Sequence, residues 1–204
     1  AKAEEYESVL MKVTGATCAS GSAGSYVVND GSGNLTVYKS IFTGLTLEVG
    51  RKYDITGVLV WFNTSSIYRL YPRSAADVYA YSNDATLSTF TLGGQDVLAL
   101  SGIVVANPAT DPGATLHVDN FTGFAGIVAA ATSAKATFAI TLNGATVDPT
   151  SYATQALADG DVVVATVTAE DGIVKHYKVT LSGENRTLTV TAPAGGESYS
   201  TGQP

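Results

Sequence analysis

The stretch YVVNDGSGNLTVY, residues 26–38, consists of two short apolar runs on either side of a polar, glycine-rich loop. In the second run Leu35 and Val37 alternate with side chains of a different kind, and this period of two is the pattern of a strand with one buried face. Gly31 in the loop adopts the positive φ angles that a tight turn requires. The stretch therefore predicts a β-hairpin in which Tyr38 points away from the apolar pair.

Strand patterns of the same kind lie on both sides of this hairpin. The strands expected in the first part of the chain are residues 8–18, 25–30, 34–39, 53–63 and 66–72. The longer link of residues 40–50 follows the third of them, and a short helical turn fits there. Five strands with a long link after the third predict a small five-stranded Greek-key barrel of the OB type.

The rest of the chain also reads as strands separated by glycine-containing turns. The strands expected there are residues 86–92, 96–105, 114–121, 125–131, 135–142, 161–169 and 173–181. The clearest hairpin is VVVATVTAEDGIVKHYKVTL, residues 162–181, which turns at Asp171-Gly172. About seven strands at this spacing predict an Ig-like β-sandwich.

These patterns divide the chain into three parts. We expect an OB-like barrel over residues 1–80 and an Ig-like or cadherin-like sandwich over 81–188, with a linker at 78–84. Residues 189–204 are expected to be a tail that begins a further, truncated module.

Composition supports an all-β fold and limits the choice of partners. Hydrophobic residues make up 45% of the 204 residues and charged residues 14%, against about 25% charged in an ordinary soluble domain. Valine and threonine, which favour strands, take much of the remainder. The net charge is −7, and all of it lies in residues 81–204, so a polyanion is repelled by the second part and neither attracted nor repelled by the first.

Catalytic patterns are missing from the sequence. No serine lies in a Gly-x-Ser-x-Gly turn, and no phosphate-binding loop ends in Gly-Lys-Ser/Thr. Cys18 is the sole cysteine, which excludes an intrachain disulfide, and its position at the end of an apolar strand predicts a buried, inert thiol. We therefore expect no enzyme, no catalytic residues and no cofactor.

Two places in the sequence offer side chains that can ligate a metal. The loop of residues 29–34 holds one carboxylate, Asp30, whereas calcium loops supply several. His117 and Asp119 share a strand face, but zinc requires three or four ligands and the other histidine, His176, is distant in sequence. We expect a simple turn in the loop, solvent-facing histidines and no bound metal.

Aromatic and basic side chains crowd the first part of the chain. OB barrels bind nucleotides or sugars by stacking on aromatic rings with cationic support. The candidate ligand-binding residues are Tyr26, Tyr38, Arg51, Trp61, Tyr68 and Arg69. The alternative is structural, because cross-strand aromatic pairs stabilise a sheet by themselves.

The pieces YVVNDGSGNLTVY, LEVGRKYDITGVLV and YRLYPRSAADV resemble the OB-like module of exported Bacteroidota proteins, often found beside secreted nucleases; this resemblance covers residues 9–78. ATLSTFTLGG and VTAEDGIVKHYKVTL resemble the opening and closing pieces of bacterial cadherin-like or Ig-like sandwiches, from which residues 95–160 depart. The final PAGGESYSTGQP is similar to the start of a further extracellular β module.

The resemblance implies accessory modules of a larger exported or cell-surface bacterial protein, which space or dock a functional domain. Their partners would be other domains of the same polypeptide, without membrane insertion, since the sequence has no apolar run long enough to span a bilayer. The chain begins without methionine, and we expect a processed or excised piece. The alternative is an OB-like barrel that binds single-stranded nucleic acid or a glycan and delivers substrate to a secreted nuclease or other hydrolase.

Overall fold

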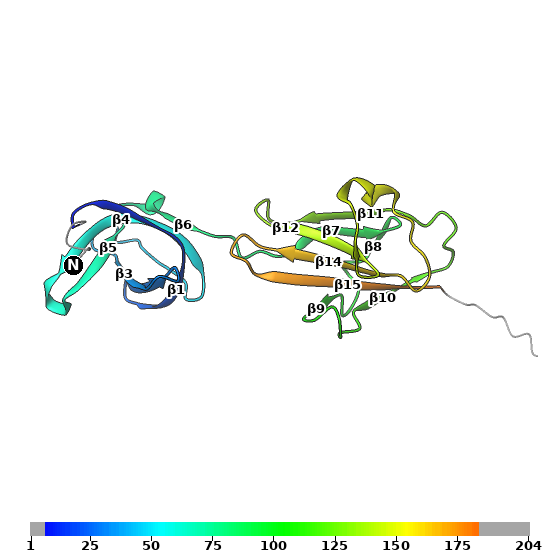
Figure 1. Ribbon diagram of the computed structural model, residues 1–204, viewed down its shortest axis with the longest axis horizontal. Helices are drawn as coiled ribbons and strands as arrows, with labels where there is room; N and C mark the ends of the chain where they lie inside the picture. The colour runs from blue at the N-terminus through cyan, green and yellow to red at the C-terminus, as the bar shows by residue number, and fades with distance from the viewer. Residues whose placement is uncertain (1–6, 184–204) are drawn as a thin grey trace, which may run out of the picture.

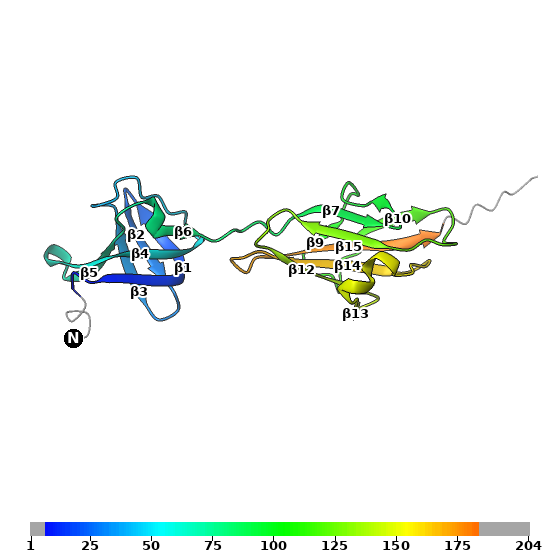
Figure 2. The ribbon, with the colours of Figure 1, turned by 90° about the horizontal axis from the view of Figure 1, so that it is seen from above.

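The computed structural model describes residues 7–183 and shows two β units arranged end to end (Figures 1 and 2). Strands β1 to β6 form the first unit and strands β7 to β15 the second. The expected all-β class, with a small closed barrel followed by packed sheets, is confirmed. The expected tail of residues 189–204 lies outside the described residues.

The first unit is a closed barrel. Its strands are β1 (Leu10–Ser22), β2 (Ser25–Asn29), β3 (Asn34–Tyr38), β4 (Lys52–Phe62), β5 (Ile67–Tyr71) and β6 (Val78–Ala80). Within residues 7–183 they form one sheet in the order β1-β2-β3-β5-β4-β6, and pairing of β1 with β4 closes the first five into a barrel. Strands β3 and β5 run parallel, and the other pairs are antiparallel.

Strand β1 closes the barrel because it bends and changes partner. Its first half pairs with residues 52–58 of β4, and its second half pairs with β2. The register with β4 shifts between Val13 and Ala16, and Gly15 between them has a φ of +61°. The bend therefore lies at a glycine, where a positive φ carries no steric penalty.

The barrel is plugged at one end. Alternate β4 side chains, among them Tyr53, Ile55 and Leu59, point inward and are buried, as a period of two requires. Leu45 and Leu47, from the link between β3 and β4, are also buried in this core. The helical turn expected at residues 40–50 is wrong, because the chain makes isolated hydrogen-bonded turns there, such as the one closed by the bond from Leu45 to Phe42, and no helix.

Part of the expected linker belongs to the barrel. Residues 78–80 form β6, which pairs with the start of β4 along the same edge that β5 occupies further on. The short 3-10 helix η3 (Ala75–Asp77) precedes β6. There the Asp77 carboxylate accepts hydrogen bonds of 2.8 Å from the backbone nitrogen, Nε and a terminal nitrogen of Arg73. Residues 78–80 therefore do not belong to the linker expected at 78–84, and only residues 81–84 connect the two units.

The second unit has two layers. Its strands are β7 (Leu87–Leu92), β8 (Gln95–Asp96), β9 (Val104–Val105), β10 (Ala114–Val118), β11 (Ile127–Ala131), β12 (Thr137–Leu142), β13 (Ala145–Thr146), β14 (Val162–Thr168) and β15 (Val174–Gly183). In the described part of the chain one sheet has the order β10-β15-β14-β12-β13, with β9 beside β15, and the other has the order β11-β7-β8.

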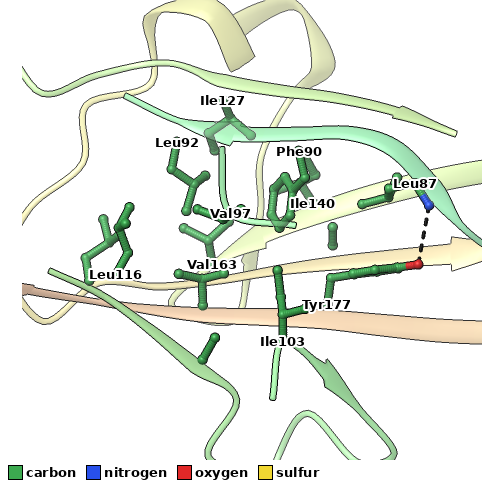
Figure 3. Close-up of a cluster of buried hydrophobic side chains, with 14 of the residues drawn as sticks. Leu87, Phe90, Leu92, Val97, Ile103, Leu116, Ile127, Ile140, Val163 and Tyr177 are labelled. Atoms are coloured by element: carbon green, nitrogen blue, oxygen red, sulfur yellow. Dashed lines mark hydrogen bonds between the residues drawn. The ribbon is translucent and has the colours of Figure 1, made fainter. Parts of the chain in front are cut away.

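The core of the second unit lies between these layers. Figure 3 shows Phe90, Leu92 and Ile127 on one sheet facing Val163 and Tyr177 on the other. The buried Tyr177 hydroxyl accepts a hydrogen bond of 3.3 Å from the backbone nitrogen of Leu87. This bond joins the two layers where β7 begins.

One expected strand in this unit is wrong. The strand expected at residues 96–105 is replaced by two short paired segments, Gln95–Asp96 and Val104–Val105, and the chain turns between them. Strand β10 also pairs parallel to β15, a long-range arrangement that the sequence did not indicate. The 3-10 helix η4 (Pro149–Thr154) was missed as well.

Candidate functional site

The outer face of the barrel carries a stack of aromatic rings around Arg69. The Arg69 guanidinium carbon lies 3.4 Å from the centre of the Phe62 ring and 4.7 Å from that of Tyr38. Tyr38 meets Tyr71 edge to face, with ring centres 6.0 Å apart. Strand pairing explains the assembly, because β4, β5 and β3 are consecutive in the sheet.

This stack occupies ring faces that a ligand would need. A guanidinium over an aromatic ring stabilises the fold by about 0.5–1 kcal/mol at an exposed site. Nε of Arg69 is buried without a hydrogen-bond partner in the described structure, so contacts with the rings hold this part of the side chain in place. The structure therefore brings together Tyr38 and Arg69, two of the candidate ligand-binding residues, but their side chains contact each other instead of facing a free binding surface.

Trp61 and Tyr68 form a second aromatic pair, at the free end of the barrel. They lie opposite each other in β4 and β5 with ring centres 4.9 Å apart. Trp61 is 37% exposed, and its indole nitrogen donates to Oδ1 of Asn63 at 3.4 Å. Trp61 continues the inward-facing row of β4 beyond Leu59, so the pair stands at the rim of the barrel rather than on its outer wall.

The rim surrounds an apolar mouth. Opposite the plugged end, a cavity of about 190 Å³ opens. Its lining is apolar or aromatic apart from Lys12, and the residues are Met11, Lys12, Val13, Leu35, Leu59, Tyr68 and Leu70. An apolar cavity of about 150 Å³ accepts a benzene ring, so the mouth has room for one apolar side chain.

Two candidates lie elsewhere. Tyr26, a candidate ligand-binding residue, is 8% exposed and belongs to the core. Gly21 makes room for it, because a Cβ there would lie 2.2 Å from the Tyr26 ring. Arg51 lies near the connecting segment, where its terminal nitrogens are 3.3 Å from the Glu48 carboxylate and 3.4 Å from the carbonyl oxygen of Tyr81. The six candidates therefore do not form one site.

The loop of residues 29–34 satisfies its own polar groups. Oδ1 of Asp30 accepts from the Ser32 hydroxyl at 2.6 Å and from the Ser32 backbone nitrogen at 3.0 Å. These hydrogen bonds lower the pKa of Asp30. Asn29 accepts from Gly31 at 2.7 Å in the same way. These are the local bonds of a turn.

The histidines are far apart. His117 lies opposite Ser182 in the β10–β15 pair, and His176 is six residues earlier in β15, which is about 20 Å away. His176 Nδ1 lies 2.9 Å from the Thr166 hydroxyl. In residues 7–183 no group of three or more His, Cys, Asp or Glu side chains could hold a metal ion.

The thiol of Cys18 is buried, and burial raises its pKa. Its sulfur lies 3.6 Å from the carbonyl oxygen of Ser20. A thiol that is buried and stays protonated is a poor nucleophile.

A polar cluster joins the two units at Glu170, in the β14–β15 turn. Its carboxylate accepts from the Tyr79 hydroxyl at 2.6 Å and from the Ser82 backbone nitrogen at 3.0 Å, and Lys135 lies 3.6 Å away. The hydrogen bonds from Ser82 and Tyr79, together with Lys135, lower the pKa of Glu170 against the effect of burial. We call these residues the junction cluster.

Neighbouring backbone groups extend the junction. Lys52 of β4 donates to the carbonyl oxygen of Asp171 at 2.9 Å, and the Asp171 nitrogen donates to Ser82 at 3.1 Å. The hydrogen bonds from Lys52, Tyr79 and Ser82 to this turn join residues 88 to 119 positions apart in sequence, so no local pattern indicated the cluster. The one sequence feature that pointed to this region was the Asp171-Gly172 turn. It predicted that Glu170 lies at the tip of a hairpin, but it did not indicate which residues Glu170 contacts.

Comparison of the chain with protein-family models and with curated proteins finds no match. Among the described residues, no helix has the length and apolar character needed to cross a membrane.

Proposed function

We propose that the chain is a non-catalytic pair of accessory β modules that hold other domains of a larger polypeptide at a fixed separation and orientation. The observation that carries this proposal is the junction cluster, in which one carboxylate, that of Glu170, receives groups from β6, the connecting segment and the second unit. Two units joined by a flexible linker would not form such a set of contacts with each other.

The path of the chain supports the same function. The start of β1 pairs with the middle of β4, at Val58, whereas β6, which leads to the second unit, pairs with Tyr53 to Ile55 near the beginning of β4. Strand β15 then starts at the junction and runs to the far end of the second unit (Figure 1). The described chain thus runs from one pole of the molecule to the other, as in a spacer between two attachments.

The proposal includes finer assignments of fold and location. The order β1-β2-β3-β5-β4-β1, with β3 parallel to β5, supports an OB-type barrel, and the two packed sheets support an Ig-like unit. Together with the resemblance of residues 9–78 to modules of exported bacterial proteins, this points to an extracellular or cell-surface location.

Residual dipolar couplings measured on both units test the spacer function, because they report whether two bodies share one orientation. We expect a single alignment tensor for the unaltered protein and two separate tensors for Glu170→Ala. Asp96→Ala, which removes a carboxylate of the second unit outside the junction cluster, is the control and should keep one tensor. Independent tensors in the unaltered protein would rule out a fixed spacer.

The second candidate function is ligand binding by the barrel, with a glycan or single-stranded nucleic acid as substrate for a secreted nuclease or other hydrolase. The exposed Trp61 beside Tyr68 favours it, because aromatic rings stack on bases and sugars. A glycan array with Trp61→Ala as control, and single-stranded DNA titrated at low salt, test it. Absence of binding in both, at the ionic strength where phosphate contacts are strongest, would exclude this function.

A further inference from the structure

The first half of β1 has a free backbone edge. Residues 10–13 pair with β4 on one side, and the pairing of β1 with β2 begins only at Thr17. Among the described residues, no strand therefore pairs with the other side of residues 10–14. Such an edge presents unpaired N–H and C=O groups at the spacing of a strand.

A hollow of about 330 Å³ lies between this edge and the β2–β3 loop. It contains the polar side chains of Asp30, Ser32 and Asn34 on the loop side. Met11, Val13 and Leu35 line both this hollow and the apolar mouth, so the two spaces adjoin each other. We call the free edge, the hollow and the mouth together the barrel slot.

The charges around the barrel slot differ on its two sides. Lys12 of β1 is neutralised by Asp54, with Nζ 2.8 Å from Oδ2. Asp30 instead contacts Ser32, and none of the ion pairs in the described part of the chain involves it. Its lowered pKa keeps it ionised at neutral pH. The slot therefore offers one uncompensated negative charge beside an apolar cavity.

We propose that the barrel slot binds an extended peptide by strand addition to residues 10–14 of β1. One apolar side chain of the peptide enters the mouth, and a lysine or arginine two residues along, on the same face of the added strand, reaches Asp30. Strand addition combines backbone hydrogen bonds for affinity with pockets for alternate side chains for specificity. A glycan has no apolar group to fill the mouth. A peptide can pair with the free edge of β1, place an apolar side chain in the mouth and place a basic side chain beside Asp30.

The test uses the whole chain and a capped heptapeptide, Thr-Val-Leu-Thr-Lys-Val-Thr, as probe. Trp61 is the single tryptophan of the sequence and stands at the rim of the mouth, so its fluorescence reports occupancy. We expect saturable binding with new protection of residues 10–14 from hydrogen exchange. Replacing the peptide leucine by serine should weaken binding at least tenfold, because the buried apolar contact is lost.

Variants of the protein separate the parts of the slot. Met11→Glu should abolish the fluorescence change, and Asp30→Asn should weaken binding about threefold, as for an exposed ion pair. Val128→Glu, which alters an exposed side chain of the second unit, is the control and should bind as the unaltered protein does. A peptide with proline in place of the central threonine loses a backbone donor and should bind more weakly.

Several results would overturn the proposal. These are no binding at millimolar peptide, binding that Met11→Glu leaves intact, or protection that appears outside β1. Protection of residues 10–14 that grows with protein concentration in the absence of peptide would assign the slot to a second copy of the chain instead.

Discussion

Replacement of Asp77 by asparagine should destabilise the barrel by about 2 kcal/mol at pH 7. The carboxylate is 8% exposed and accepts three hydrogen bonds from Arg73. These bonds lower its pKa from an ordinary 3.8 to about 2. At about 1.4 kcal/mol for each pH unit the difference amounts to about 2.5 kcal/mol, and the asparagine oxygen keeps a small part of it.

The pH dependence follows from the direction of this change. Because the folded pKa lies below the unfolded one, the contribution of Asp77 is fully present above about pH 4 and is lost as the pH falls through 2. Urea unfolding followed by Trp61 fluorescence measures the barrel alone, since Trp61 is the sole tryptophan. The free-energy gap between the unaltered protein and Asp77→Asn should shrink between pH 5 and pH 2.

Asp111→Asn in the second unit should leave the Trp61 transition unchanged and serves as control. A gap below about 0.5 kcal/mol at pH 7 would refute the reasoning, because that is the range of ordinary exposed ion pairs. A gap that persists undiminished at pH 2 would show that the asparagine acts through packing instead of charge.

Three further outcomes are expected. Gly57→Ala should lower barrel stability by about 2–3 kcal/mol in the same urea assay, as overpacking does, since its Cβ would lie 2.8 Å from the backbone of Tyr71; a neutral result would mean that β4 and β5 separate easily. Tyr177→Phe should cost the second unit about 1–3 kcal/mol in thermal unfolding, because it leaves the buried nitrogen of Leu87 unsatisfied; an unchanged melting temperature would contradict this. Acidification should loosen the junction, because the pKa of Glu170 is lowered and its contacts therefore lose their contribution as the pH falls through that folded pKa; a single alignment tensor retained in the most acid solution in which both units stay folded would count against it.

Strands such as β4 and β14 were predictable because their residues alternate between a buried and a more exposed face. Residues 34–39 and 53–63 were expected as strands, and β3 and β4 occupy Asn34–Tyr38 and Lys52–Phe62. The pattern failed at residues 96–105, where Val97 and Ile103 are buried in the core from turns. A segment whose apolar residues are buried without pairing in a sheet has the same apolar composition as a strand, so the sequence does not distinguish the two.

Site residues were harder to predict because strand parity alone does not say which face is inside. Tyr26 and Tyr38 flank the same loop, yet one fills the core and the other lies against Arg69. The deciding feature is Gly21 on the neighbouring strand, whose missing side chain leaves space for the Tyr26 ring. Likewise the contacts of Glu170 depend on how two units meet, which is information that no single segment carries.

The position of β15 in the second unit has a mechanical consequence. The strand begins at the junction, ends at the opposite pole, and lies between β14 and β10 in the sheet. Tension applied along the long axis of the molecule pulls β15 parallel to its neighbours. Its ladder bonds are then strained together in shear and do not open one after another like a zipper. The unit is therefore built to carry load along the line that joins its two ends.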